Sequence, residues 1–479
     1  MAHNSQPRAE SVGPQSIRPL LFLTLWLVIL LGYVQQRAFN SSSPASRLDL
    51  LRALVEQHTL VIDAYHTNTL DKAYFNGHFY SDKAPGSVAL ALAPFATVSW
   101  LLGNTGSDLR VLAAGWAASV FSQALPASLG AAALFMWLNG FVSSRVAFIV
   151  IAAFMLGGIP LPYSSLLFSH AQVFGLIGIG VWALDLFGEA RHSGWECEPS
   201  KKRTILAGAC IGLAVSSEYT AGLVAVGFTG YALCRRRRHI AAFVSSMVPP
   251  LLLIPAYSWL TIGTPFDLPY SFQFSFPEMN KGVYAIGYPD LGTLYNLVIS
   301  PTRGLFFWTP FLAMAIGGCW SKWRFSRPFW YLCCLLPCLQ LIVISGRIWD
   351  WQAGPTVSAR YLTPIIPLLA LPCALGTERW PKLGGVLAVV SIAMMTLATL
   401  TDACPDNTIY NPLTELHIPK LLRGEFSYTL GTEVFGVPPW ASVALYYAIL
   451  VGGIAWLWHL TGKADQAAAS QPLINAEGH

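Results

Sequence analysis

The chain has 479 residues, of which 54% are hydrophobic and only 11% are charged, and its formal net charge is +5. Soluble domains carry about 25% charged residues. The composition therefore excludes an ordinary soluble enzyme and, with a mean hydropathy of +0.51, indicates a protein that crosses a membrane many times.

The first apolar run, 19–36, follows a polar segment that contains Arg8 and Arg18. No small-residue cleavage site follows Leu31, so we interpret this run as a retained membrane span and not as a signal peptide. Further runs are long enough to cross a bilayer, which takes about 20 residues. They lie near 86–103, 146–162, 168–188, 240–260, 303–320, 328–346, 361–376, 383–401 and 440–461.

Two apolar runs are longer than one span requires. Pro126 interrupts the run Val111–Phe141, and Ser216–Glu218 interrupts the run Thr204–Cys234. If each run is a pair of helices, the chain has fourteen spans, and counts of twelve or thirteen remain open. The fold class predicted is an all-α polytopic integral membrane protein with about 12–14 transmembrane helices.

Charge indicates the orientation of these spans. With the N-terminus in the cytoplasm, the cytoplasmic segments carry an excess of Lys and Arg, as the positive-inside rule expects. The basic run Arg235–Arg238 is then a topology anchor, and we expect no nucleic-acid partner. The long loops 37–85, 261–302, 347–360 and 402–439 all fall outside. The predicted divisions are a cytoplasmic tail 1–18, a membrane core 19–401, an outer loop and last span 402–461, and a polar tail 462–479.

The loop between Arg37 and Gly86 contains four Asp, three Arg and two Lys, which is dense for so apolar a chain. Ser43 and Pro44 are typical of a helix start. From there Leu48, Leu51 and Val55 repeat on one face and Asp49, Arg52 and Glu56 on another. This pattern predicts an amphipathic helix at the membrane surface, although a solvated charged face would have the same pattern.

The sequence contains no GxxxxGK[ST], HExxH, GxSxG or CxxC motif, and the spacing of its nine Cys and ten His suggests no metal site. The candidate site residues are instead ionisable groups that the topology sends to the outer side. They are Asp49, Arg52, Asp63, Asp71, Lys72, Asp82, Lys83, His170, Glu218, Arg303, Arg347, Asp350 and Arg360. Carboxylates can accept a proton from an attacking hydroxyl, and Arg and Lys can hold a phosphate. Ion pairs that close a transporter vestibule would use the same residue types.

Short motifs at these residues resemble the membrane glycosyltransferases of the C-type fold, the group that includes protein O-mannosyltransferases and the lipid A aminoarabinose transferase. Tyr80-Ser81-Asp82-Lys83-Ala84-Pro85 is similar to their Tyr-Phe-Glu-Lys-Pro-Pro. The run from Gly212-Leu213-Ala214 to Ser217-Glu218-Tyr219 is similar to a Gly-Leu-Ala … Thr-Lys-Gly hairpin. The segments 300–307 and 358–364 look like those of a less characterised bacterial branch.

The resemblance implies transfer of a sugar from a polyprenyl-phosphate-linked donor to a glycan, lipid or protein acceptor, by direct displacement with inversion and without a cofactor. It also implies a bacterial cytoplasmic membrane with the site facing outside. The family has Asp-Glu soon after the first span, where this chain reads Asn40-Ser41-Ser42-Ser43-Pro44. Asp49 or Asp82 would therefore be the base, with Asp49 favoured. Lys83, Arg52 and Arg360 would hold the donor phosphate. A transporter or flippase, and a non-catalytic relative that binds lipid-linked glycans, remain alternatives.

Overall fold

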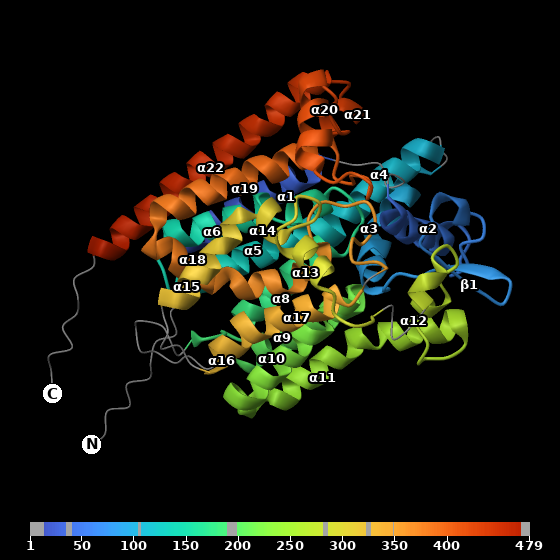
Figure 1. The fold of residues 1–479 in the computed structure, drawn as a ribbon, viewed down its shortest axis with the longest axis horizontal. Helices are drawn as coiled ribbons and strands as arrows, with labels where there is room; N and C mark the ends of the chain where they lie inside the picture. Colours follow the sequence, from blue (N-terminus) through green and yellow to red (C-terminus); the bar gives the residue numbers. More distant parts are fainter. Residues whose placement is uncertain are drawn as a thin grey trace.

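The computed structural model describes residues 14–34, 41–103, 107–188, 199–280, 286–321, 327–347 and 349–470. Most of the predicted tail 1–18, the end of the predicted tail 462–479 and the start of the first loop lie outside these residues. Figure 1 shows a helical bundle with one short hairpin at one end.

The α-helices are α1 (Pro14–Tyr33), α2 (Ser42–Glu56), α3 (Gly86–Leu102), α4 (Ser107–Ser119), α5 (Leu125–Leu138), α6 (Ser144–Leu156), α7 (Pro160–Ser164), α8 (His170–Ala183), α9 (Lys201–Ser217), α10 (Gly222–Arg235), α11 (Ile240–Leu251), α12 (Leu253–Ile262), α13 (Leu291–Val298), α14 (Leu305–Trp308), α15 (Met314–Ser321), α16 (Arg327–Trp330), α17 (Leu336–Ser345), α18 (Ala370–Arg379), α19 (Pro381–Thr401), α20 (Ile418–Arg423), α21 (Leu430–Glu433) and α22 (Pro439–Ser470). The strands β1 (Lys72–Phe75) and β2 (His78–Ser81) form an antiparallel hairpin.

Six helical segments of the described chain are long and apolar enough to cross a membrane: 108–138, 237–262, 327–345, 360–379, 381–401 and 439–467. Shorter apolar helices accompany them at 19–33, 86–102, 144–156, 170–183 and 310–320. These segments confirm the predicted fold class, an all-α polytopic membrane protein.

The run Val111–Phe141 is not a pair of helices. It belongs to one helical segment, 108–138, which continues from α4 into α5 through Pro126. Arg110 near its start bonds to Glu56 at the end of α2, whereas Trp137 near its end donates to the carbonyl of Leu186 at the opposite end of the bundle. The predicted span 86–103 is α3, which packs against α4 near α2 (Figure 1). The count of fourteen spans assigned three crossings to residues 86–141, namely 86–103 and a helix pair within 111–141. The structure favours one crossing there, which agrees with the count of twelve spans.

The run Thr204–Cys234 is a pair of helices, as the polar interruption indicated. It forms α9 and α10, and Glu218 lies in the turn between them. Arg203 in the first turn of α9 donates to the carbonyl of Trp182, the residue before the end of α8. The turn at Glu218 is consequently at the end of the bundle that also holds the first loop.

The helix predicted in the first loop is α2, but it begins earlier than expected. Its N-cap is Ser41, and Ser43 lies inside the helix. Leu48 and Leu51 are buried against α3 and α4, and Asp49 is buried as well. The helix therefore does not lie on a surface with one solvated face, because neighbouring elements cover both of its faces.

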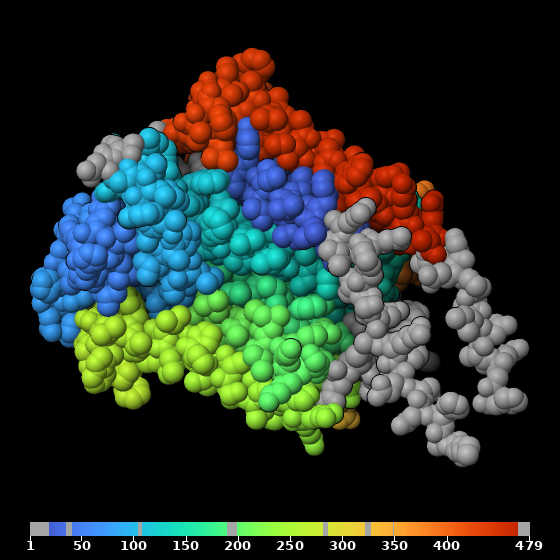
Figure 2. All heavy atoms as spheres, turned by 180° about the vertical axis from the view of Figure 1, so that it is seen from behind, coloured from blue at the N-terminus to red at the C-terminus, as the bar shows by residue number. Residues whose placement is uncertain are grey.

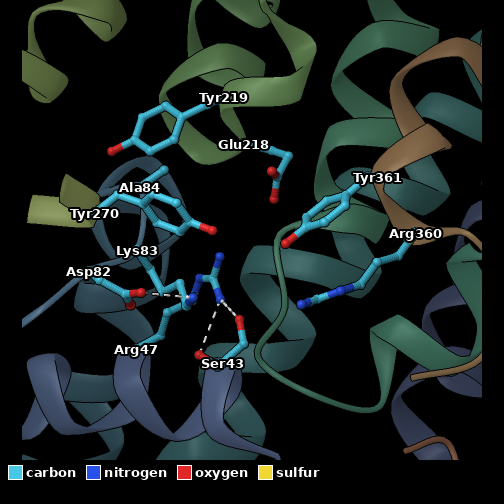
Figure 3. A pocket seen from close by; sticks show the side chains of 10 residues that line it. All are labelled: Ser43, Arg47, Asp82, Lys83, Ala84, Glu218, Tyr219, Tyr270, Arg360 and Tyr361. Carbon is cyan, nitrogen blue, oxygen red and sulfur yellow. Dashed lines mark hydrogen bonds and ion pairs between the residues drawn. The ribbon is translucent and has the colours of Figure 1, made fainter. Parts of the chain in front are cut away.

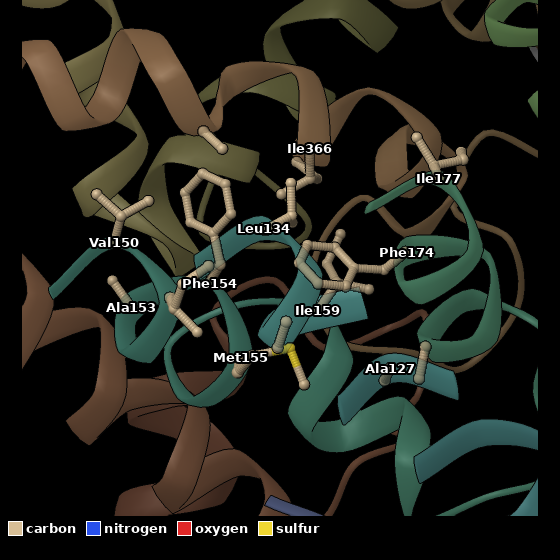
Figure 4. Close-up of a cluster of buried hydrophobic side chains, with 14 of the residues drawn as sticks. Ala127, Leu134, Val150, Ala153, Phe154, Met155, Ile159, Phe174, Ile177 and Ile366 are labelled. Atoms are coloured by element: carbon tan, nitrogen blue, oxygen red, sulfur yellow. The ribbon is translucent and has the colours of Figure 1, made fainter. Parts of the chain in front are cut away.

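A hydrophobic cluster extends through much of the bundle, and the part drawn in Figure 4 lies between α5, α6, α8 and the 3₁₀ segment 360–369. Phe154 and Phe174 meet there edge to face with their ring centroids 6.4 Å apart. A Cβ on Gly175 would collide with the backbone of Pro126 and Ala127 on the facing helical segment. Glycine thus allows the two backbones to touch, as small residues do where membrane helices cross. The result is a rigid frame beneath the first loop.

The first loop packs against the segment that follows α12. Figures 1 and 2 show the two side by side at one end of the molecule. Ala73 of β1 pairs with Gln273 in an isolated antiparallel bridge, and the hydroxyl of Tyr257 in α12 donates to the carbonyl of Ser81 at 2.8 Å. These contacts place the end of β2 among several helix ends.

Candidate functional site

A cavity of about 50 Å³ lies where the first loop meets the helix ends (Figure 3). Its walls come from α2, the end of β2, the α9–α10 turn, the loop after α12 and the start of the 3₁₀ segment 360–369. The lining residues are Ser43, Arg47, Asp82, Lys83, Ala84, Glu218, Tyr219, Tyr270, Arg360 and Tyr361. The lining combines three cations, two carboxylates and three tyrosines, so the cavity suits an anionic, hydroxylated ligand.

The chain that carries Asp82 and Lys83 is held closely on both sides. The buried hydroxyl of Ser81 bonds to Ser46 of α2 at 2.8 Å. On the other side, a Cβ on Gly86 would lie 2.5 Å from the Ser217 hydroxyl and 2.7 Å from the carbonyl carbon of Ser216. Only glycine allows α3 to begin so close to the end of α9. This close approach brings Lys83 and Glu218 to the same cavity.

Arg47 and Arg360 enter the cavity from different elements. Arg47, which is 2% exposed, donates to the hydroxyl of Ser43 at 2.7 Å and to that of Ser169 at 3.3 Å. Arg360 donates to the carbonyl of Ala353, and its Nη1 lies 3.3 Å from Nε2 of His170. Among the described residues, no carboxylate is in direct contact with either guanidinium, so both keep charge available for an anion.

Asp82 is fully buried, and its two oxygens differ. Oδ2 accepts from Gln273 Nε2 at 2.6 Å and from Lys83 Nζ at 3.1 Å, whereas Oδ1 has no hydrogen-bond partner. Burial raises the pKa of Asp82 to about 6, although the nearby Lys83 lowers it in part. Desolvation of this carboxyl therefore outweighs the opposing effect of the ion pair with Lys83.

Lys83 joins two carboxylates. Its Nζ lies 2.8 Å from Asp71 and 3.1 Å from Asp82. Burial alone would lower the pKa of Lys83, but the two carboxylates raise it above its ordinary value. Lys83 therefore remains charged at the cavity wall.

Glu218 supplies the second carboxylate of the cavity. Its Oε2 accepts from Ser169 at 2.8 Å and lies 3.9 Å from Nδ1 of His170. The close-up in Figure 3 shows this carboxylate with Tyr270 on one side and Tyr361 on the other. His170 itself is buried behind the lining, where one ring nitrogen faces Glu218 and the other faces Arg360.

Two candidates, Arg347 and Asp350, lie behind the tyrosines rather than in the lining. Arg347 and Asp350 form an ion pair at 2.5 Å, and Asp350 accepts from Tyr270 at 3.1 Å and Tyr361 at 2.8 Å. Burial opposes ionisation of Asp350, but Arg347 and the hydrogen bonds hold the pKa of this carboxyl below its usual range. The pair thus fixes the direction of both phenol groups.

Asp49 and Arg52 do not line the cavity. Asp49 accepts from Asn68 at 3.0 Å, its other oxygen has no hydrogen-bond partner, and burial raises its pKa to about 7. Arg52 bonds to Glu56 at 3.3 Å and covers the ring of Tyr65. Successive residues of a helix point about 100° apart, so the face of α2 that carries these residues differs from the face that carries Arg47.

The remaining candidates also lie outside the lining. Asp63 bonds to His78 at 2.7 Å on the surface, and Lys72 donates to the carbonyl of His66 at 2.6 Å. Arg303 is fully buried and donates at 2.8 Å to both the carbonyl of Thr302 and the side chain of Asn407. Within the described parts of the chain, no three His, Cys, Asp or Glu side chains are grouped to hold a metal ion.

Sequence reasoning missed Arg47 and the three tyrosines of the lining, Tyr219, Tyr270 and Tyr361. Arg47 has a weak signal, because it follows Ser43 by one helical turn and shares its face. Tyr361 lies within the segment 358–364, whose resemblance was noted. Tyr270 lies in a long loop where no pattern marks it.

No family model matches the sequence, and no curated protein sequence matches it either. Similar solved structures include the following two. ArnT from Cupriavidus metallidurans, bound to undecaprenyl phosphate, is 16% identical with a TM-score of 0.48, over 95% of this chain and 78% of that chain. The oligosaccharyltransferase from Archaeoglobus fulgidus, in complex with zinc and sulfate, is 13% identical with a TM-score of 0.39, over 81% of this chain and 53% of that chain.

Proposed function

We propose that this membrane protein transfers a sugar from a polyprenyl-phosphate-linked donor to an acceptor at the extracytoplasmic face of the membrane. The observation that carries the proposal is the cavity in which Arg47, Lys83 and Arg360 surround a small space beside Asp82. The motif resemblance at Tyr80–Pro85 supports the same chemistry.

The three cations are suited to the donor phosphate. A phosphate that leaves a sugar gains negative charge, and fixed donors around it stabilise the transition state more than the ground state. Arg47 and Arg360 offer planar forks of donors, and Lys83 offers a point charge. Arg52, which was expected in this role from the sequence, is occupied by Glu56 outside the lining, so Arg47 takes its place in the proposal.

The best candidate for the base is Asp82. Its Oδ1 is buried without a hydrogen-bond partner, while Oδ2 is fixed by Gln273 and Lys83. A carboxylate with a pKa of about 6 is mostly ionised at neutral pH, yet it is a stronger base than an exposed one. Asp49 has an even higher pKa of about 7 but does not line the cavity, so it is our second choice.

The reaction is a single displacement. The acceptor hydroxyl gives its proton to Asp82 Oδ1, and its oxygen forms a bond to the anomeric carbon of the donor sugar. The bond between that carbon and the phosphate oxygen breaks, and its electron pair leaves with the polyprenyl phosphate. The configuration at the anomeric carbon inverts, and the step needs no oxidant or reductant.

A transfer assay tests the proposal. Purified protein in lipid nanodiscs is incubated with radiolabelled polyprenyl-phosphate sugars and with membranes that supply acceptors. We expect free polyprenyl phosphate and labelled acceptor to appear together for one of the donors. Movement of intact donor across sealed vesicles without sugar release would instead favour the flippase alternative.

A further inference from the structure

The hairpin next to the cavity carries a group of aromatic rings that the proposed chemistry does not use. Tyr74 and Phe79 are directly opposite each other in the β1–β2 pair. Phe274 joins them because Gln273 bridges to Ala73 and the amide of Phe274 donates to the carbonyl of Lys72 at 3.0 Å. We call Tyr74, Phe79 and Phe274 the aromatic platform.

The three rings hold one another in place. Their centroids are 4.9 Å apart for Tyr74 and Phe79, 5.3 Å for Phe79 and Phe274, and 5.7 Å for Tyr74 and Phe274. His66 stacks on Phe79 at 4.2 Å. Such contacts fix ring positions and cost a ligand little entropy on binding. Yet Tyr74 is 44% exposed and Phe274 is 55% exposed, so two rings remain open to a ligand.

Polar side chains surround these rings. Asp63 and His78 form an exposed ion pair on the same hairpin region, and Lys72 lies 5.2 Å from the centroid of Phe79. A ligand that fits this surface has a flat apolar face for the rings and hydrogen-bonding groups at its rim. A pyranose has both, since its axial C–H groups form an apolar face and its hydroxyls are donors and acceptors.

The platform is connected to the cavity through the chain. Gln273 directly precedes Phe274, and its side chain donates to Asp82 at 2.6 Å. The strand that carries Phe79 ends at Ser81, one residue before Asp82. Directly adjacent residues therefore join the platform to the group that we propose as the base.

We infer that the aromatic platform binds the acceptor and that the acceptor is a carbohydrate. This inference rests on the proposed function, because it names the acceptor class for the same site. A bilayer surface is the competing partner for exposed aromatic rings. The exposed Asp63 beside the platform disfavours insertion, since a carboxylate is costly within the membrane.

Binding can be measured without any donor. Saturation-transfer NMR on the full-length protein in nanodiscs would be recorded with maltotetraose, mannotetraose and chitotetraose as probes. We expect at least one to bind, and Tyr74→Ala and Phe274→Ala each to weaken that binding about threefold to tenfold, the value of one aromatic contact. Tyr288→Ala removes an aromatic side chain that is 90% exposed but outside the platform, and it should change nothing. Failure of all three probes to bind, or equal losses in the control, would overturn the inference.

The bilayer alternative has its own readout. A cysteine at Tyr74 in a cysteine-free variant is labelled with the fluorophore NBD, and the protein is placed in nanodiscs with brominated lipids. We expect no quenching at this position. Quenching at position 74 would identify the platform as a membrane surface and overturn the inference. Hydrolysis of a polyprenyl-phosphate sugar by the same protein separates the acceptor inference from the proposed function. Hydrolysis without oligosaccharide binding refutes the acceptor inference alone. Oligosaccharide binding without any donor turnover refutes the proposed function.

Discussion

Gln273→Met should change the pH dependence of transfer by altering Asp82. The amide of Gln273 donates to Asp82 Oδ2 at 2.6 Å inside a fully buried site. This hydrogen bond stabilises the ionised carboxylate, so its loss should raise the pKa of Asp82 above about 6. Methionine has nearly the same length, which keeps the packing.

The size of the effect follows from the strength of such a bond. A hydrogen bond to a charged group contributes about 1.5–3 kcal/mol, and one pKa unit corresponds to about 1.4 kcal/mol. The pKa should therefore rise by about one to two units. A general base works only when it is ionised. The pH below which activity is lost should therefore also rise by about one to two units in the variant.

The assay is the pH profile of kcat/KM for sugar transfer, compared with the profile of Gln352→Met. Gln352 is a glutamine of the loop 347–360 that is outside the cavity lining. We expect the acidic limb to move upward only for Gln273→Met. A loss of activity that is equal at all pH values, with the limb unmoved, would refute the role of Gln273 in setting the pKa of the base.

Three further predictions follow from the same contacts. Lys83→Ala should raise the KM for the lipid-linked donor at least about tenfold, because one of three cations is lost; an unchanged KM in the folded variant would remove Lys83 from the phosphate site. Single cysteines at Asn76 and Gln352, in a cysteine-free variant, should react with an impermeant thiol reagent in intact cells, and labelling only after lysis would reverse the orientation. Gly86→Ala should destabilise the protein by about 1–3 kcal/mol in thermal unfolding, because its Cβ meets the backbone of Ser216; a wild-type melting temperature would contradict the close approach of α3 to α9.

Local patterns in the sequence predicted the parts of the site that lie close together in the chain. The helix α2, the α9–α10 turn with Glu218 and the pair Asp82–Lys83 all form where the motifs indicated. Each depends on helix signals or on a few adjacent residues. Such features can be predicted because the local sequence determines them.

Burial and long-range partners could not be predicted in this way. The periodicity of α2 indicated two faces, but it did not reveal that both would be covered, which is why Asp49 is buried and not solvated. Gln273 lies 191 residues from Asp82, so no local pattern connects them. The raised pKa of Asp82 could not be predicted for the same reason, since its desolvation depends on tertiary packing.

The number of membrane spans also could not be predicted from local sequence alone. The apolar composition of 86–103 is typical of a membrane span, yet α3 packs against α4 beside α2 and the next helical segment makes the crossing. The connection between α3 and α4 moves from one side of the membrane to the other when two spans are removed from the count. This move leaves the charge asymmetry of the positive-inside rule unaffected, because Asp108 and Arg110 near that connection have opposite charges. Hydropathy measures how apolar a helix is, but it does not show whether the helix crosses the membrane.

The most direct test of the central claim compares Asp82→Asn with Asp49→Asn in single-turnover transfer from a radiolabelled polyprenyl-phosphate sugar. Loss of a general base costs about a hundredfold or more. We predict that loss for Asp82→Asn, with Asp49→Asn within about tenfold of the wild type. The reverse pattern would assign the base to Asp49. Transfer by both variants at the wild-type rate, or none by the wild type with any donor, would contradict glycosyl transfer at this cavity.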